Sequence, residues 1–178
     1  MTDIIKNRRS VRKYADKKLE REVLCEALCA ARFVPSWKNS QSVRYYVTDS
    51  REMLSRLGGL YPEGEKNGNT IRNAAALIAV VSENGVSGCD EWGEFLTPRG
   101  SHWQSFDAGI AAQTLCLALF ERGVASGIIG HFEEEGVRAV LEIPEGFSIS
   151  ALISAGYASE ELPVPPKKDF SELVHFID

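Results

Sequence analysis

A cluster of cations near the start of the chain surrounds one small hydroxyl group. Arg8, Arg9 and Arg12 flank Ser10 in a chain whose formal net charge is −5. Guanidinium groups present fork-shaped donors that match phosphate oxygens, and a serine hydroxyl adds a short donor. The cluster therefore predicts a site for a small anion. From charge alone, the alternative is a solvated basic surface.

A second polar cluster, PSWKNSQ, occupies residues 35–41. The side-chain amides of Asn39 and Gln41 each offer donors and an acceptor. That combination suits the edge of a heteroaromatic ring that needs both. The same amides equally suit the backbone of a loop, so this cluster alone leaves the two interpretations open.

The chain lacks the short motifs of several common catalytic sites. It has no G-x-S-x-G, no Walker loop, no H-E-x-x-H and no G-x-G-x-x-G. His102, His131 and His175 are scattered and suggest neither a triad nor a metal cage. None of the four cysteines forms a C-x-x-C pair, so we expect reduced thiols packed as small hydrophobes. We predict no metal site.

Periodicity predicts the elements that position these clusters. Helices are expected from Ile4 to about Arg8, from Leu19 to Phe33, from Ser50 to Gly58-Gly59 and over 133–143. Strands are expected at 44–50, 75–83 and 148–158, with a short one within 124–130. The stretch 75–83 is apolar on both faces, which favours a central position in a sheet.

The clearest predicted helix covers 107–122 and is apolar almost all round, so we expect it to be buried. A long glycine-bearing loop, 84–103, precedes it, and loops of this length are often lids or binding loops. The tail from Leu162 is rich in proline and ends in a short apolar segment. We expect it to pack on a neighbour, such as another subunit.

Bulk properties indicate one globular domain over residues 1–178. The hydrophobic content is 44% and the charged content 25%, which is ordinary for such a domain. No apolar run reaches the length of a membrane helix and no signal peptide is recognisable, so we expect a cytoplasmic protein without a membrane partner. The acidic balance beyond residue 44 argues against nucleic acid as a partner.

Taken in order, the motifs resemble the FMN-dependent nitroreductase family along nearly the whole chain, although each motif alone is weak. The matching segments are Arg8–Tyr14 (R-R-S-x-R-x-[FY]), Pro35–Tyr45 (P-S-x-x-N-x-Q-P-W-x-F), the AALIAVV strand, Asp107–Gln113 (D-x-G-x-x-x-Q), Gly123–Gly130 (G-[LV]-x-S-x-x-I-G), Ile143–Gly146, Gly156-Tyr157 and Pro166–Lys168. The chain departs from the pattern at Ser42-Val43, where Pro-Trp is usual, and at His131, where a small residue or an acid is common.

The resemblance implies an α+β nitroreductase-like fold, with a mixed, mostly antiparallel sheet flanked by helices, in an intertwined homodimer with FMN at the interface. Arg8, Ser10, Arg12 and one of Lys167 and Lys168 would meet the phosphate. Segment 35–41 would come from the other subunit. The implied cofactor-binding residues are Arg8, Arg9, Ser10, Arg12, Pro35, Ser36, Trp37, Asn39, Gln41, Asn67, Ile129, Gly130, Lys167 and Lys168.

The resemblance also implies an oxidoreductase. Hydride from NADH or NADPH would pass through FMN to a small acceptor such as a nitroaromatic or a quinone, and no side chain need act as a catalytic acid or base. The alternatives are a non-catalytic FMN-binding or redox-sensing protein, and a specialised member with another substrate. Relatives vary the substrate lid in the region of loop 84–103, so substrate identity does not carry over.

Overall fold

The computed structural model describes residues 2–177. One antiparallel sheet has the strand order β1-β2-β4-β3. Its strands are β1 (Val43–Thr48), β2 (Ala76–Glu83), β3 (Ala125–Ile129) and β4 (Phe147–Gly156). The helices are α1 (Thr2–Asn7), α2 (Arg21–Ala31), α3 (Arg51–Gly59), α4 (Lys66–Asn73), α5 (His102–Glu121), α6 (Glu134–Leu141) and α7 (Phe170–Leu173), and a 3-10 turn, η1, spans Trp37–Asn39.

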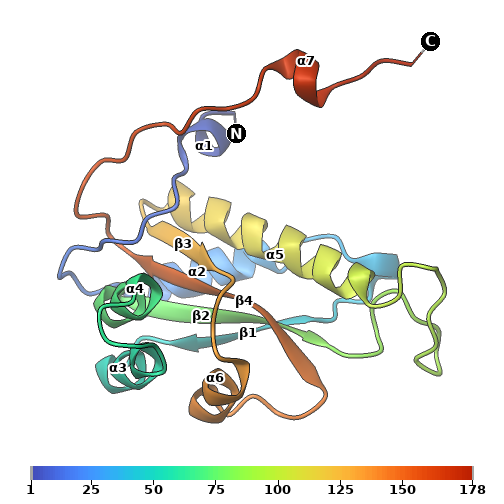
Figure 1. The fold of residues 1–178 in the computed structure, drawn as a ribbon, viewed down its shortest axis with the longest axis horizontal. Helices are drawn as coiled ribbons and strands as arrows, with labels where there is room; N and C mark the ends of the chain where they lie inside the picture. The colour runs from blue at the N-terminus through green and yellow to red at the C-terminus, as the bar shows by residue number, and fades with distance from the viewer. Residues whose placement is uncertain (1, 178) are drawn as a thin grey trace.

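The helices cover both faces of the sheet (Figure 1). Side chains alternate across a strand, so β2 sends Ile78 and Val80 toward α2 and α5, and Leu77 and Val81 toward α3, α4 and α6. All four side chains are fully buried. The predicted α+β class and the central position of residues 75–83 are confirmed. The parallel component of the sheet is confined, within residues 2–177, to an isolated bridge between Ser10 and Ser126.

One predicted boundary is wrong and another is confirmed. Helix α5 begins at His102, inside the stretch predicted as loop, because Trp103 packs on Trp37 and extends the helix. Helix α3 ends at Gly59, as predicted, and its Gly58 also lies in the surface that packs on α4. A Cβ on Gly58 would lie 2.9 Å from the carbonyl oxygen of Gly68, which shows how closely α3 approaches α4.

Two apolar surfaces remain open. Helix α5 buries one face against the sheet, whereas Phe106 near its beginning is 58% exposed, so burial of the whole helix stays a prediction for the assembled dimer. The tail leaves the body beside α1 and runs outward to α7 (Figure 1). Its apolar side chains are also exposed, with Phe170 at 68% and Phe176 at 82%. Among residues 2–177, no helix is long and apolar enough to cross a membrane.

Candidate functional site

The segment that carries the cationic cluster is anchored to the edge strand β3. The Val11 amide donates to the carbonyl oxygen of Ser126 at 2.9 Å. Tyr14 turns inward, where its hydroxyl contacts the Val11 carbonyl at 2.9 Å and Ser154 Oγ at 2.8 Å. Burial raises the pKa of Tyr14 above its ordinary value, so this phenol stays protonated. Because Val11 and Tyr14 are buried, the polar residues between and before them remain at the surface.

A cavity of about 840 Å³ brings the two ends of the chain together. Its lining residues are Ile5, Lys6, Asn7, Arg8, Arg9, Ser10, Leu162, Pro163, Val164, Pro165 and Lys167. Arg12 lines a smaller cavity beside it, which also includes Ser10. Lys168 lines neither of these two cavities. The structure thus gathers most of the predicted anion-binding residues, and it puts Lys167 nearer to them than Lys168.

The arginines of this cluster differ in their availability. Arg9 Nη1 donates to the carbonyl oxygens of Lys6 at 2.6 Å and Arg8 at 2.9 Å, which ties it to the end of α1. Its Nε is buried without a partner among the described residues. Neither Arg8 nor Arg12 has a side-chain hydrogen bond or ion pair within residues 2–177. These free donors fit a phosphate group in charge and in number.

Asn67 contacts the backbone just beyond Gly130, at the far end of β3. Asn67 Nδ2 donates to the His131 carbonyl oxygen at 3.4 Å, and the Tyr61 hydroxyl donates to the same oxygen at 3.0 Å. Ile129 is buried and Gly130 is exposed. Ser126 and Gly130 are four residues apart on an extended strand, which spans about 13 Å. One edge of the sheet therefore carries the cationic cluster at one end and an amide-lined backbone at the other.

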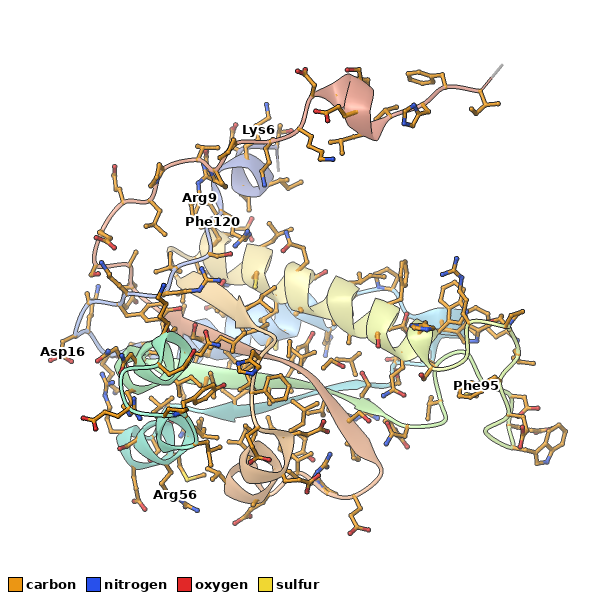
Figure 2. All side chains as sticks on the ribbon, viewed as in Figure 1. Lys6, Arg9, Asp16, Arg56, Phe95 and Phe120 are labelled. Atoms are coloured by element: carbon orange, nitrogen blue, oxygen red, sulfur yellow. The ribbon has the colours of Figure 1, made fainter. Side chains whose placement is uncertain are left out.

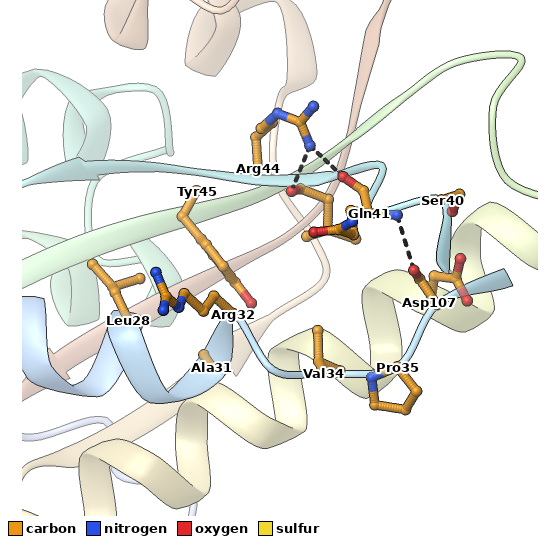
Figure 3. Close-up of a pocket in the computed structure, with 12 residues that line it drawn as sticks. Leu28, Ala31, Arg32, Val34, Pro35, Ser40, Gln41, Arg44, Tyr45 and Asp107 are labelled. Carbon is orange, nitrogen blue, oxygen red and sulfur yellow. Dashed lines mark hydrogen bonds between the residues drawn. The ribbon is translucent and has the colours of Figure 1, made fainter. Parts of the chain in front are cut away.

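The second polar cluster packs against the N-terminal half of α5. The Trp37 amide donates to both carboxylate oxygens of Asp107, at 3.0 and 3.2 Å. Ser36 Oγ accepts from the Gln41 amide at 2.9 Å. A cavity of about 570 Å³ lies between this segment, α2 and β1 (Figure 3). Pro35, Ser36 and Gln41 line it, whereas Trp37 and Asn39 do not.

Tyr45 lines this second cavity, and burial changes the pKa of its phenol. The hydroxyl of Tyr45 is buried with no hydrogen-bond partner among the described residues. Burial raises the pKa of Tyr45 to about 12. The phenol therefore stays neutral over the physiological range.

The two clusters do not meet within one chain. Arg9 and Phe120 line one cavity near the C-terminal end of α5, whereas Asp107 and segment 35–41 lie near its beginning. Figure 2 shows Lys6, Arg9 and Phe120 at one end of α5 and Phe95 beyond the other. At 1.5 Å per residue, Asp107 and Phe120 are about 20 Å apart along the helix. Within one chain, the two clusters therefore lie near opposite ends of α5.

Sequence reasoning missed Asp107 as the anchor of Trp37, although the D-x-G-x-x-x-Q motif contained it.

The expectation that the cysteines pack as small hydrophobes is wrong for Cys25 and Cys29, which are exposed on α2. It is right for Cys89 and Cys116, which are buried. Burial raises the pKa of the Cys116 thiol. Within residues 2–177, no group of three or more His, Cys, Asp or Glu side chains could hold a metal ion.

Comparisons with known proteins agree with this architecture. The profile described as "Nitroreductase family" matches residues 5–61 and 60–157. A protein of Methanothermobacter thermautotrophicus, provisionally named NADH dehydrogenase/NAD(P)H nitroreductase, is 30% identical over 162 residues, which cover 89% of this chain and 77% of that protein.

Solved structures give the same result. The FMN-dependent nitroreductase of Clostridium difficile R20291 superposes with a TM-score of 0.77 at 28% identity, covering 100% of this chain and 99% of that one. A nitroreductase family protein of Streptococcus pneumoniae TIGR4 shares the fold, with a TM-score of 0.86, 24% identity and 99% of each chain covered. The chain belongs to the nitroreductase family, whose members generally use a flavin for oxidation and reduction.

Proposed function

We propose that residues 1–178 form one FMN-binding domain of an NADH- or NADPH-dependent oxidoreductase, whose acceptor is a small molecule such as a nitroaromatic or a quinone. The observation that carries the proposal is the edge of the sheet at β3. It has free cationic donors beside Ser10 and an exposed backbone with an amide side chain near Gly130. That layout suits an elongated ligand with a phosphate at one end and a flat polar ring at the other.

At the phosphate end, Arg8, Ser10 and Arg12 would donate directly, and Lys167 would close the cavity from the tail. Arg9 would act mainly by holding the end of α1, since its guanidinium already contacts two carbonyl oxygens there. Lys168 is the weaker candidate because it lies outside both cavities.

At the ring end, the backbone at Ile129 and Gly130 and the side-chain amide of Asn67 would orient the flavin. The bound flavin would supply the redox chemistry, taking a hydride from NADH or NADPH and giving electrons to the acceptor. The chain's own part is to bind, to orient and to provide donors that favour negative charge on the ring. No side chain is assigned as a catalytic acid or base.

The proposed site is complete only in a homodimer. Segment 35–41, with Pro35, Ser36, Trp37, Asn39 and Gln41, lies near the opposite end of α5 from the cationic cluster, so it would serve the flavin held by the partner. The exposed apolar side chains of the tail support the same assembly, because contiguous apolar surface of this kind usually marks an interface. The open face of α5 is the second surface that a partner would cover.

An anaerobic reduction experiment tests the proposed activity. Purified protein loaded with FMN is mixed with NADH or with NADPH under nitrogen, and the visible flavin absorbance is followed. Bleaching with one of the two, reversed by a nitroaromatic or a quinone, is the expected result. Stable colour with both reductants would favour a flavin-binding sensor, and a protein that does not retain FMN would overturn the assignment of the site.

A further inference from the structure

Asp107 connects two segments that are distant in sequence. Its side chain is 2% exposed. Oδ2 accepts the Trp37 amide at 3.0 Å and the Ser87 hydroxyl at 2.7 Å. Ser87 lies near the start of loop 84–101, and Trp37 begins the turn of segment 35–41. One carboxylate oxygen therefore holds both segments at the N-terminal half of α5.

Trp103, one helical turn before Asp107, makes a second connection between the same segments. Its ring centroid lies 4.5 Å from that of Trp37. Its Nε1 donates to Thr97 Oγ1 in the loop at 2.9 Å. The loop also passes directly over this ring, because a Cβ on Gly88 would lie 2.9 Å from Trp103 Cβ. A displacement of the loop must therefore disturb both of the contacts that hold Trp37.

Segment 35–41 has a backbone that needs such anchors. Lys38, Asn39 and Gln41 have positive φ angles of 45°, 57° and 49°. Each non-glycine residue in this region costs of order 1 kcal/mol, and such strain persists only where neighbours hold it. Within the segment, the backbone amide of Gln41 donates to Ser36 Oγ, and the backbone amide of Trp37 donates to Asp107. Because these two hydrogen bonds hold the backbone of the segment, they also determine where the side chains of Asn39 and Gln41 start.

We propose that Asp107 is a positioning residue that couples loop 84–101 to segment 35–41, through the oxygen shared by Ser87 and Trp37. A molecule that binds to loop 84–101 then changes how tightly segment 35–41 is held, and with it the position of the Asn39 and Gln41 side chains. The coupling itself is a property of one chain. Only its consequence for cofactor binding rests on the proposed function, in which segment 35–41 faces the flavin.

The test removes the connection on the loop side only. Ser87→Ala deletes the hydroxyl that contacts Asp107 and leaves the Trp37 amide in place. Ser82→Ala is the matched control, since Ser82 is a fully buried serine in the preceding strand whose hydroxyl has no partner among the described residues. Amide hydrogen exchange of the full-length protein, without added FMN, is followed for residues 37–41 and 84–101.

Coupling predicts that Ser87→Ala accelerates exchange in both segments, by about tenfold at the Trp37 amide, as for loss of a hydrogen bond to a charged group. Ser82→Ala should leave both unchanged. Acceleration confined to 84–101, or absent from both, would overturn the proposal. If Ser87→Ala does not fold, Thr97→Val, which acts through Trp103, is read in the same way. Because no flavin is added, a failure of FMN binding would not be mistaken for a failure of the coupling.

Discussion

Ser10 pairs with Ser126 in an isolated parallel bridge at the outer edge of the sheet. Extended chain places alternate side chains on opposite sides, and here Val11 points inward while Ser10 and Arg12 are exposed. Arg8, two residues before Ser10, lines the same cavity as that serine. The edge of the sheet thus sets the spacing of the three donors that we assign to the phosphate.

Removing one of these donors should weaken FMN and leave the fold intact. Arg8→Ala should cost about 2–3 kcal/mol of FMN binding free energy, the range for charge-assisted bonds. Because Arg8 has no side-chain hydrogen bond within residues 2–177, its loss removes no internal contact of that kind. A flavin fluorescence titration measures the affinity. The purified Arg8→Ala protein should be colourless or should lose flavin on desalting.

Arg56→Ala is the control for a lost surface cation. Arg56 is exposed on α3, and its one side-chain hydrogen bond among the described residues is to the Met53 sulfur at 3.6 Å. The Arg56→Ala protein should bind FMN as tightly as the native protein does. If Arg8→Ala still holds stoichiometric FMN at nanomolar protein, the phosphate assignment is wrong.

The native protein should be a dimer even below micromolar concentration. Exposed apolar side chains on α5 and on the tail, including Phe106 and Phe170, need a partner surface, and large apolar interfaces are typical of obligate dimers. Sedimentation of the flavin-loaded protein measures the mass. A monomer that keeps its flavin is incompatible with a shared site.

Tyr45→Phe should stabilise the protein. The buried hydroxyl of Tyr45 has no partner among the described residues, so its removal should raise the free energy of unfolding by about 1 kcal/mol at neutral pH. Burial raises the pKa of Tyr45 from 10.0 to about 12. The folded state therefore holds this proton more tightly, and the associated stability is lost as pH rises from about 10 to 12. Urea unfolding should show the advantage of the variant growing across that window.

Tyr14→Phe is the matched control, for which we expect the opposite effect on stability. The Tyr14 hydroxyl contacts the Val11 and Ser154 carbonyl oxygens and Ser154 Oγ, at 2.9, 3.0 and 2.8 Å. Its loss should destabilise the protein by about 1–2 kcal/mol. A destabilised Tyr45→Phe protein would mean that the Tyr45 hydroxyl has a partner in the assembled protein.

Trp92 is the aromatic side chain best placed to contact an acceptor. It is 78% exposed on the loop, whose turn is held by Asp90 Oδ1, which accepts from the amides of Trp92 and Glu94. Trp92→Ala should change KM for an aromatic acceptor severalfold and leave FMN affinity nearly intact. Trp37→Ala should change KM as well, but at a cost in stability, because that ring packs on Trp103.

Steady-state kinetics beside a flavin titration separates the two roles. Should both variants lose FMN or dimerisation in proportion to activity, the aromatic rings are structural and stacking with the acceptor is excluded.

Much of the fold was predictable because its core strands are unmistakable. Residues 75–83 are apolar on both faces, and β2 occupies 76–83 between two partners. Helix α4 was not predicted, because its sequence KNGNTIRN has little apolar periodicity. It forms where Gly68 lets it approach α3, since a Cβ there would lie 2.9 Å from the carbonyl oxygen of Gly58. Tertiary packing of this kind leaves almost no local signal.

The candidate site was predictable as a set of residues and not as an arrangement. The spacing of Arg8, Ser10 and Arg12 suggested an anion site, and the cavity gathers these residues with Lys167. The separation of this cluster from segment 35–41 depends on the path of α5 between them. Likewise, the sequence identifies Asp107 but does not indicate that its carboxylate receives the Trp37 amide.

The strand order has a consequence for how the chain is made. Strand β4 is the last to be synthesised, yet it lies between β2 and β3. Until β4 is available, β3 has no neighbouring strand and β2 has one open edge. Exposed strand edges are templates for aggregation. Translation pauses ahead of β4 should therefore reduce the yield of folded protein more than pauses after it.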